Sequence, residues 1–107
     1  MRILLDECVP KRFGRTLAGH DVRTVSQEGW AGKKNGELLA LMSASGFDVL
    51  LTVDQGLRYQ QNLHAVRVAV VVMIGAGNQL VDLTPLVTNV LAALSTVRPG
   101  DAVEVRE

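Results

Sequence analysis

Three acidic residues, Asp6, Glu37 and Asp54, occupy positions suited to binding a divalent cation. Asp6 and Asp54 each follow a short apolar run, and Glu37 falls in the first turn of an expected helix. Mg²⁺ and Mn²⁺ take oxygen ligands, and Mg²⁺ usually binds through one or two carboxylates together with several waters. A cation held in this way activates a water for attack on a phosphodiester and stabilises the leaving oxygen. The three acids therefore predict a phosphodiester-cleaving site, provided that the fold brings them together.

The order of the expected elements predicts a fold that does so. Short apolar runs bounded by polar residues are typical of strands buried on both faces of a parallel sheet. We predict strands over residues 2–5, 20–25, 48–53, 67–74 and 102–105. We predict helices over residues 10–17, 36–45, 55–62 and 85–94, opened by Pro10, by Asn35 as an N-cap, near Gln55, and by Thr84 as an N-cap. Strands that alternate with helices predict one doubly wound α/β domain, residues 1–107, with a mainly parallel sheet.

The carboxyl ends of parallel strands are where such a fold binds its ligands. If the strands before Asp6 and Asp54 are parallel, both acids lie at this edge, and the helix that contains Glu37 begins there too. Structural alternatives stay open for each acid. Glu37 is also where an acid favours the helix dipole, and Asp54 is placed to cap the helix near Gln55. Glu7 is either a supporting acid beside the site or a solvated surface residue.

The composition excludes some classes of protein and favours others. The chain has eleven basic and eleven acidic residues, so it is not a strongly basic, nonspecific nucleic-acid binder. Residues 1–34 nevertheless hold seven basic residues against four acids, which leaves room for a local basic patch. Cys8 is the single cysteine, which is compatible with a reducing compartment. We see no signal peptide, and the longest apolar stretch, residues 66–76, is too short to span a bilayer. We therefore expect a soluble, cytoplasmic protein with no membrane association.

A second group of residues is suited to holding a phosphate backbone beside the acids. Amide groups donate to a phosphate without adding charge, Lys and Arg supply charge, and Tyr stacks on bases. Each also has a structural alternative, because Asn35 is placed to cap a helix and residues 60–62 form a polar helix end. The candidate substrate-binding residues are Lys34, Asn35, Arg58, Tyr59, Gln60, Gln61 and Asn62.

Several segments of the chain are similar to one known family. The similarity covers nearly the whole chain and is carried by residues 3–10, 29–39, 51–54, 59–63 and 82–86. In these segments the chain resembles a small bacterial PIN-like family of unknown function, related to Mut7-C domains and to VapC-type ribonuclease toxins. The resemblance implies a compact PIN-like α/β/α sandwich of three layers.

The resemblance also implies a function for the three acids. In PIN nucleases, acids at the positions of Asp6, Glu37 and Asp54 bind Mg²⁺ or Mn²⁺ and cleave single-stranded RNA. Some relatives are toxins encoded beside a small antitoxin protein that covers the site. The chain departs from the pattern at Gly56, where many PIN-like proteins carry another acid. The site then holds one metal weakly, uses Glu7 instead, or no longer cleaves RNA.

Three function classes follow, with the ribonuclease toxin first. The second is a catalytically degenerate PIN-like module that binds a protein partner or RNA without cleavage. The third is a phosphorylation receiver, which also has an acid pair after its first strand and an Asp after its third. A receiver needs a lysine after its last core strand, and no lysine follows Lys34, which disfavours this class. The exposed side of the helix after Thr84 would also serve a homodimer.

Overall fold

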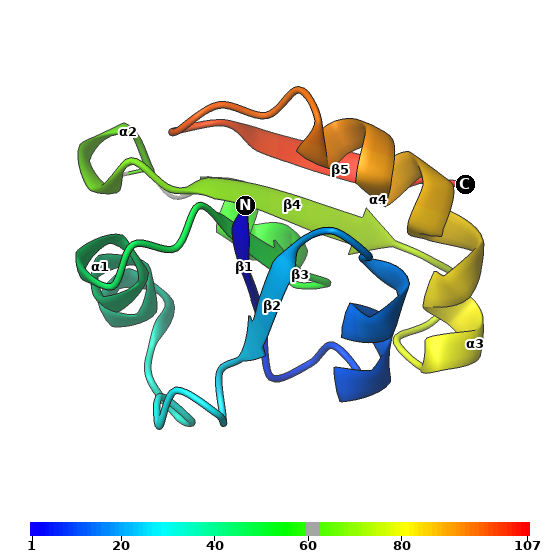
Figure 1. Ribbon diagram of the computed structural model, residues 1–107, viewed down its shortest axis with the longest axis horizontal. Coiled ribbons are helices and arrows are strands. Elements are labelled where there is room, and N and C mark those ends of the chain that lie inside the picture. Colours follow the sequence, from blue (N-terminus) through cyan, green and yellow to red (C-terminus); the bar gives the residue numbers. More distant parts are fainter. Residues whose placement is uncertain (60–62) are drawn as a thin grey trace.

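A five-stranded sheet in the order β2-β1-β3-β4-β5 forms the centre of the computed structural model, and every pair of neighbouring strands is parallel (Figure 1). The structure describes residues 1–59 and 63–107, and only the backbone of Arg58 and Tyr59. The strands are β1 (Arg2–Leu5), β2 (Asp21–Thr24), β3 (Val49–Thr52), β4 (Ala69–Ile74) and β5 (Ala102–Arg106). The predicted α/β class and parallel sheet are thereby confirmed.

Helices connect the strands and cover both faces of the sheet. The α-helices are α1 (Asn35–Ala44), α2 (Leu63–Val66), α3 (Leu80–Leu83) and α4 (Val87–Leu94). The short 3₁₀ helices are η1 (Lys11–Thr16), η2 (Gln55–Tyr59) and η3 (Thr84–Leu86). No helix in the described part of the chain has the length and apolar character needed to cross a membrane.

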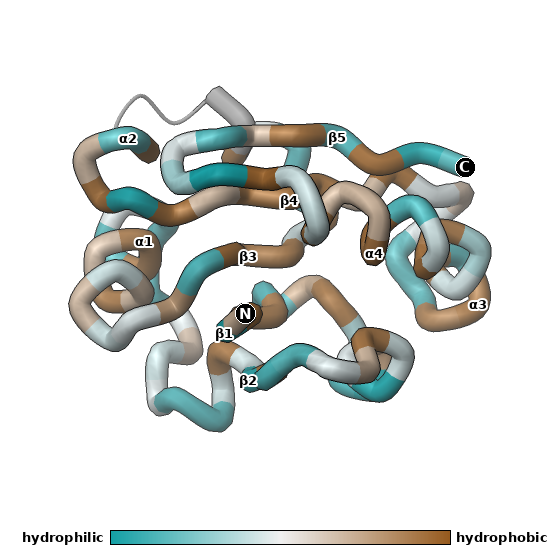
Figure 2. Tube along the Cα trace, turned by 45° about the horizontal axis from the view of Figure 1, so that its top comes forward, coloured by the Kyte–Doolittle hydropathy of each residue, from teal (hydrophilic) through white to brown (hydrophobic). Residues whose placement is uncertain are grey.

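Successive strand residues point to opposite faces, so the sheet separates two apolar cores. On one face, Ile3 and Leu5 pack with Phe13 of η1 and with Val90 of α4. On the other face, residues such as Leu4, Leu50 and Val70 pack with α1, η2 and α2. The central strands β3 and β4 are accordingly largely hydrophobic in Figure 2. The result is a layer of helices on each side of a buried sheet, which is the arrangement expected for a doubly wound domain.

Helix α1 ends as predicted but begins differently. Gly46 has a φ of 78°, and its N–H bonds to the carbonyl of Ser43 at 3.3 Å. The next N–H, from Phe47, bonds to Met42 at 3.0 Å, which completes the usual glycine stop. The predicted N-cap was wrong, because Asn35 is already the first residue of the helix and the cap position belongs to Lys34, which makes no side-chain capping bond.

The helical segment around Thr84 also begins earlier than predicted. A capping box formed by Gln79 and Asp82 starts α3, and the chain continues through η3 into α4. Thr84 is therefore not an N-cap, and its hydroxyl donates to the carbonyl of Leu80 at 2.7 Å. The prediction missed a capping box that uses Gln and Asp in place of the more usual Ser or Thr and Glu.

Candidate functional site

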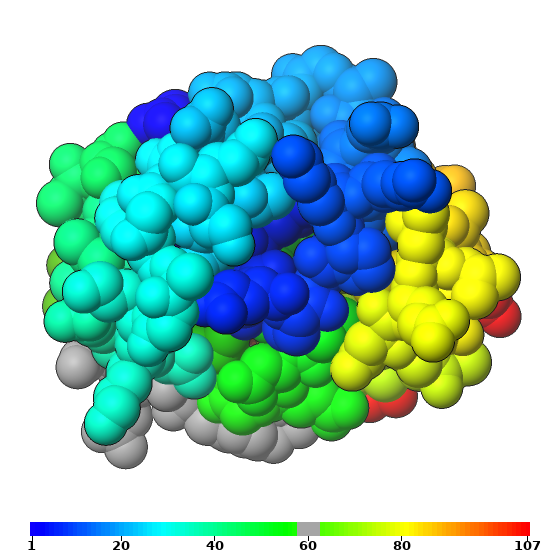
Figure 3. All heavy atoms as spheres, turned by 90° about the horizontal axis from the view of Figure 1, so that it is seen from below, coloured from blue at the N-terminus to red at the C-terminus, as the bar shows by residue number. Residues whose placement is uncertain are grey.

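The candidate site lies where the strand order reverses, between β1 and β3. In a sheet of order 2-1-3-4-5, the chain continues outward in opposite directions from this pair, which opens a crevice at the carboxyl ends of the two strands. Asp6 follows β1 directly, and its N–H continues the β1–β3 pairing by bonding to Leu51 at 3.0 Å. Asp54 follows β3 after one intervening residue. Figure 3 views the molecule from this side, with the dark blue N-terminal segment against the bright green segment after β3.

The hydroxyl of Thr52 connects the two acids. Thr52 is the last residue of β3 and is fully buried, the only polar residue among the buried ones that the structure describes. Its Oγ1 donates to Oδ2 of Asp6 at 2.7 Å and accepts the backbone N–H of Asp54 at 3.0 Å. The thiol of Cys8 lies 3.7 Å from the same oxygen. One buried hydroxyl therefore fixes the carboxylate of Asp6 and the backbone position of Asp54.

The remaining carboxylate oxygens of the pair have different surroundings. Oδ1 of Asp6 accepts the N–H of Glu7 at 2.9 Å, and Oδ1 of Asp54 accepts the N–H of Gly56 at 2.9 Å. The second bond means that Asp54 also caps the turn into η2, so the structural alternative for this residue holds. Oδ2 of Asp54 makes no hydrogen bond to any residue that the structure describes. Within the described part of the chain, it is the most available ligand atom of the pair.

Glu37 and Glu7 are engaged elsewhere, in the loop before α1. The side chain of Glu37 is 59% exposed, and Oε1 lies 3.6 Å from Nζ of Lys33. Oε1 of Glu7 accepts the N–H of Gly32 at 2.6 Å, so this acid holds the loop in place. Among the residues described, no three Asp, Glu, His or Cys side chains are grouped closely enough to hold a metal ion. Of the predicted ligands, Asp6 and Asp54 are the two that the Thr52 hydroxyl connects.

The predicted substrate-binding residues divide into three groups. Lys34 is exposed and Asn35 half-buried, and both lie at the start of α1, outside the Asp6–Thr52–Asp54 network. Arg58 and Tyr59 belong to η2, the element that follows Asp54, and their side chains are not described. Gln60, Gln61 and Asn62 lie outside the described residues.

The donor set of Asp6 and Asp54 suits a hard divalent cation. Two carboxylates meet the usual protein contribution to Mg²⁺, whose other ligands are waters and substrate phosphate oxygens. Both acids are accessible from solvent, Asp6 half-buried and Asp54 exposed, so substrate and ion have a path to them. Oxygen donors of this kind favour Mg²⁺ or Mn²⁺, whereas zinc and copper prefer imidazole and thiolate ligands.

A cavity of about 280 Å³ beside Asp6 is lined by a basic residue, Lys11, which the sequence placed in the basic excess of residues 1–34 but not at the acidic site. The cavity lining includes Glu7, Lys11 and Thr24 as well as Asp6. Lys11 comes from η1 and is the only basic side chain among the described lining residues. Thr52 was also overlooked, although it is the single polar residue within the apolar run 49–53. A polar residue in such a run is a signal that could have been used, because a buried hydroxyl needs a partner.

Fold and site together define a doubly wound α/β protein with two acids at its topological switch point. Comparison with known proteins adds no relative, since no family model, no curated protein and no solved structure matches the chain.

Proposed function

We propose that this protein is a PIN-like endoribonuclease that depends on Mg²⁺ or Mn²⁺ and cleaves single-stranded RNA. The observation that carries the proposal is the Thr52 hydroxyl, which bonds both to Asp6 and to the backbone of Asp54 at the switch point of the sheet. A buried polar group that orients an accessible carboxylate is typical of metal sites, because the outer partner fixes the direction of the ligand.

Each residue of the network has a role in this proposal. Asp6 and Asp54 would hold the ion, which when bound supplies a polarised water and stabilises the charge on the phosphodiester. Thr52 keeps Oδ2 of Asp6 in one orientation. Lys11 lines the cavity beside Asp6 and offers a positive charge to the non-bridging oxygens of a phosphate.

Glu37 is the proposed third acid and would act once it separates from Lys33. Their ion pair is an i, i+4 pair with both side chains largely exposed, at 43% and 59%. Pairs of this kind contribute only about 0.3–0.5 kcal/mol, so breaking this contact costs little. Glu7 is the alternative ligand, and its bond to Gly32 is the interaction that it would give up.

The test is cleavage of a single-stranded RNA labelled with a fluorophore and a quencher, with Mg²⁺ or Mn²⁺ and with EDTA. Asp6→Asn and Asp54→Asn are expected to reduce cleavage by at least about 100-fold, because even outer partners of a metal site are worth about 10–100-fold. Asp21→Asn is the matched control, since Asp21 begins β2 at the opposite edge of the sheet. Equal cleavage by the wild type and both site variants would refute the proposal.

A role as the toxin of a type II toxin–antitoxin pair extends this proposal. It rests on the family resemblance and predicts a small antitoxin protein, encoded nearby, that covers the carboxyl edge of the sheet. Expression of the wild type in bacteria is expected to arrest growth, whereas the Asp54→Asn variant is expected to be harmless. If both proteins arrest growth to the same extent, toxicity does not depend on Asp54, and this result would count against the toxin role.

The alternative function is a degenerate PIN-like module that binds a protein partner or RNA without cutting. It is favoured by Gly56, where another acid would stand, and by the absence of a three-acid group among the described residues. It predicts no turnover at any Mg²⁺ or Mn²⁺ concentration. Metal-dependent cleavage by the pure protein, abolished in Asp54→Asn, would eliminate it.

A further inference from the structure

A cavity of about 520 Å³ lies beside the candidate site, between η1 and β2. We call it the basic cavity; its lining includes Lys11, Arg12, Arg15 and His20. Cavities that bind small molecules usually range from about 300 to 1,000 Å³, so this one has room for a nucleotide. Apart from Lys11, the metal-dependent chemistry proposed above does not use its lining.

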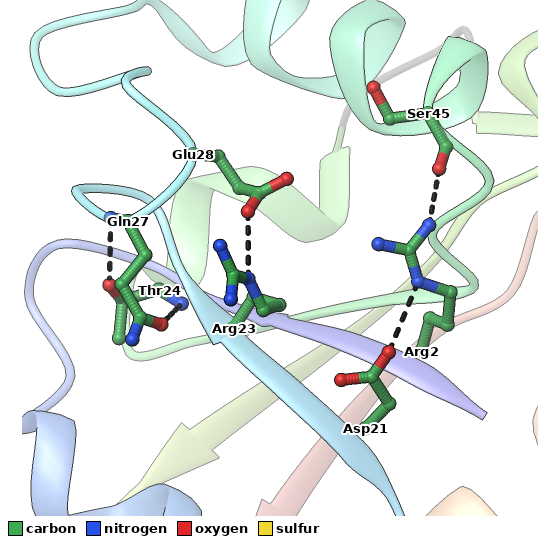
Figure 4. Close-up of polar contacts among 7 residues, drawn as sticks. All are labelled: Arg2, Asp21, Arg23, Thr24, Gln27, Glu28 and Ser45. Atoms are coloured by element: carbon green, nitrogen blue, oxygen red, sulfur yellow. Dashed lines mark hydrogen bonds and ion pairs between the residues drawn. The ribbon is translucent and has the colours of Figure 1, made fainter.

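The charge of the basic cavity is not neutralised within the described structure. Lys11, Arg12 and Arg15 are exposed and form no ion pair with any described residue. No acid is among the described residues that line the cavity. By contrast, Arg2 and Arg23 are paired, with Asp21 and Glu28 respectively (Figure 4). Three such cations around one concavity are suited to an anionic ligand, because guanidinium groups bind phosphate oxygens in a bidentate manner.

One lining residue, His20, carries a buried polar atom without a partner among the described residues. Nδ1 of His20 is buried and makes no hydrogen bond to any described residue. Such a group costs about 1–3 kcal/mol when left unsatisfied, so it calls for a partner. His20 lines the basic cavity, but this nitrogen has no surface open to it, so a ligand would meet it only after the ring turns.

The rest of the lining combines apolar surface with a fixed amide. Val22 supplies apolar surface, with the buried Leu5 behind it, and Gly14 packs against Val22 so closely that an added Cβ would lie 3.0 Å from Cγ1 of that residue. The side chain of Gln27 is held by Thr24, whose N–H donates to Oε1 of Gln27 at 2.9 Å (Figure 4). The NH₂ group of Gln27 makes no bond to a described residue and is available to donate. A flat base over apolar side chains, with a polar edge to read, fits these properties.

The basic cavity adjoins the acidic site. Lys11 and Thr24 line both the basic cavity and the smaller cavity beside Asp6. Figure 3 shows the surface hollowed between the blue segment that contains η1 and the cyan segment that follows β2. A chain of phosphates could thus pass from the arginines to the acids along one depression.

We propose that the basic cavity binds one nucleotide of a single-stranded RNA, next to the phosphodiester held at Asp6 and Asp54. The phosphate of this nucleotide lies against Arg12 and Arg15, and its base faces Val22 and the ring of His20. The position of the strand across the two acids rests on the proposed ribonuclease function. The nucleotide-binding site itself is tested by a binding measurement that does not depend on cleavage.

The experiment measures the anisotropy of a fluorescein-labelled single-stranded octaribonucleotide titrated with protein in EDTA, at several KCl concentrations. Arg12→Ala/Arg15→Ala is expected to weaken binding by at least about tenfold, since one charge-assisted bond is worth that much. The slope of log K against log salt should fall by about 0.7 for each phosphate that the variant no longer neutralises. His20→Phe, which keeps a ring but removes both ring nitrogens, is expected to weaken binding several-fold.

The matched control is Arg67→Ala/Arg98→Ala. These two arginines also form no ion pair with a described residue, and both line a small cavity beside Met1 and Asp48, at the amino-terminal edge of the sheet. The control removes the same charge and is expected to change binding by less than about twofold. If the two double variants weaken RNA binding equally, the RNA is attracted to basic charge in general, and the proposal is overturned.

Two further outcomes separate the alternatives. Displacement of the labelled RNA by uridine monophosphate at the concentration at which unlabelled octamer displaces it would mean a site for free nucleotides and would overturn the role in strand binding. Failure of the wild type to bind RNA would overturn the proposal outright. RNA binding that depends on Arg12 and Arg15, in a protein that does not cut RNA with Mg²⁺ or Mn²⁺, would support the nucleotide-binding site and refute the proposed ribonuclease function.

Discussion

Replacing Thr52 by valine tests the centre of the candidate site without changing its shape. The threonine hydroxyl is fully buried and makes two hydrogen bonds, of 2.7 Å to the Asp6 carboxylate and 3.0 Å to the Asp54 N–H. Valine has nearly the same volume, so Thr52→Val opens no cavity. It leaves a carboxylate oxygen and a backbone N–H without their shared partner.

The expected decrease in stability follows from these two bonds. A hydrogen bond to a charged group is worth about 1.5–3 kcal/mol and a neutral one about 0.5–1.5 kcal/mol. Water can reach Asp6, which is half-buried, and compensates for part of the first bond. We therefore expect Thr52→Val to lower the free energy of unfolding by about 2–3 kcal/mol, which leaves a typical domain folded.

Urea denaturation followed by circular dichroism measures this change. With an m-value of about 1–3 kcal/mol/M, the midpoint should fall by about 0.7–3 M at unchanged m. Thr52→Ser is the control, because it keeps the hydroxyl and removes one buried methyl, worth about 1 kcal/mol. Serine should thus be the more stable variant. A decrease below about 0.5 kcal/mol for valine, or valine more stable than serine, would refute the role given to the hydroxyl.

Three glycines give further predictions: Gly36 inside α1, Gly46 just after its end, and Gly56 beside Asp54. Gly46→Ala should lower the free energy of unfolding by about 1–2 kcal/mol, because φ is 78° there. Gly36→Ala should raise it by about 0.4–1 kcal/mol, because Gly36 lies inside α1 with nothing within 4 Å of an added Cβ. Thermal melts of the two variants measure these changes in stability, and a change of the same sign and size in both would contradict the reasoning. Gly56→Asp should tighten Mn²⁺ binding by about 30-fold, since a carboxylate about 4 Å from a divalent ion gains about 2 kcal/mol in water. Calorimetry measures that affinity, and an unchanged value would place the ion away from residue 56.

Much of the fold could be predicted because the strands are short, apolar and buried. The runs that contain Leu4, Leu50 and Val70 predicted three strands of the sheet, and their pairing is parallel as expected. Helix starts were harder, since a capping box of Gln79 and Asp82 and an N-cap at Lys34 use residues with weak capping preference. Such starts are decided by tertiary packing, which a single sequence does not display.

The candidate site was predicted in part, for a related reason. Strand topology places Asp6 and Asp54 at one edge, and that step needs only the order of the strands. Glu37 was expected there because α1 begins at that edge. Its ion pair with Lys33 and the bond from Gly32 to Glu7 depend on how the loop before α1 runs, and loops carry few sequence constraints. The basic cavity became visible only once β2 lay beside η1.

The bond between Thr52 and Asp6 joins residues 46 positions apart, and this separation ties the site to folding. β1 comes first in the chain but lies between β2 and β3, so it completes its pairing only after β3 has been added. Pairing over such distances is the slow part of folding, because the entropy of loop closure opposes it before the paired strands stabilise the chain. A partly folded chain therefore lacks the acidic pair. Any activity that depends on the pair should appear with the last cooperative step of folding.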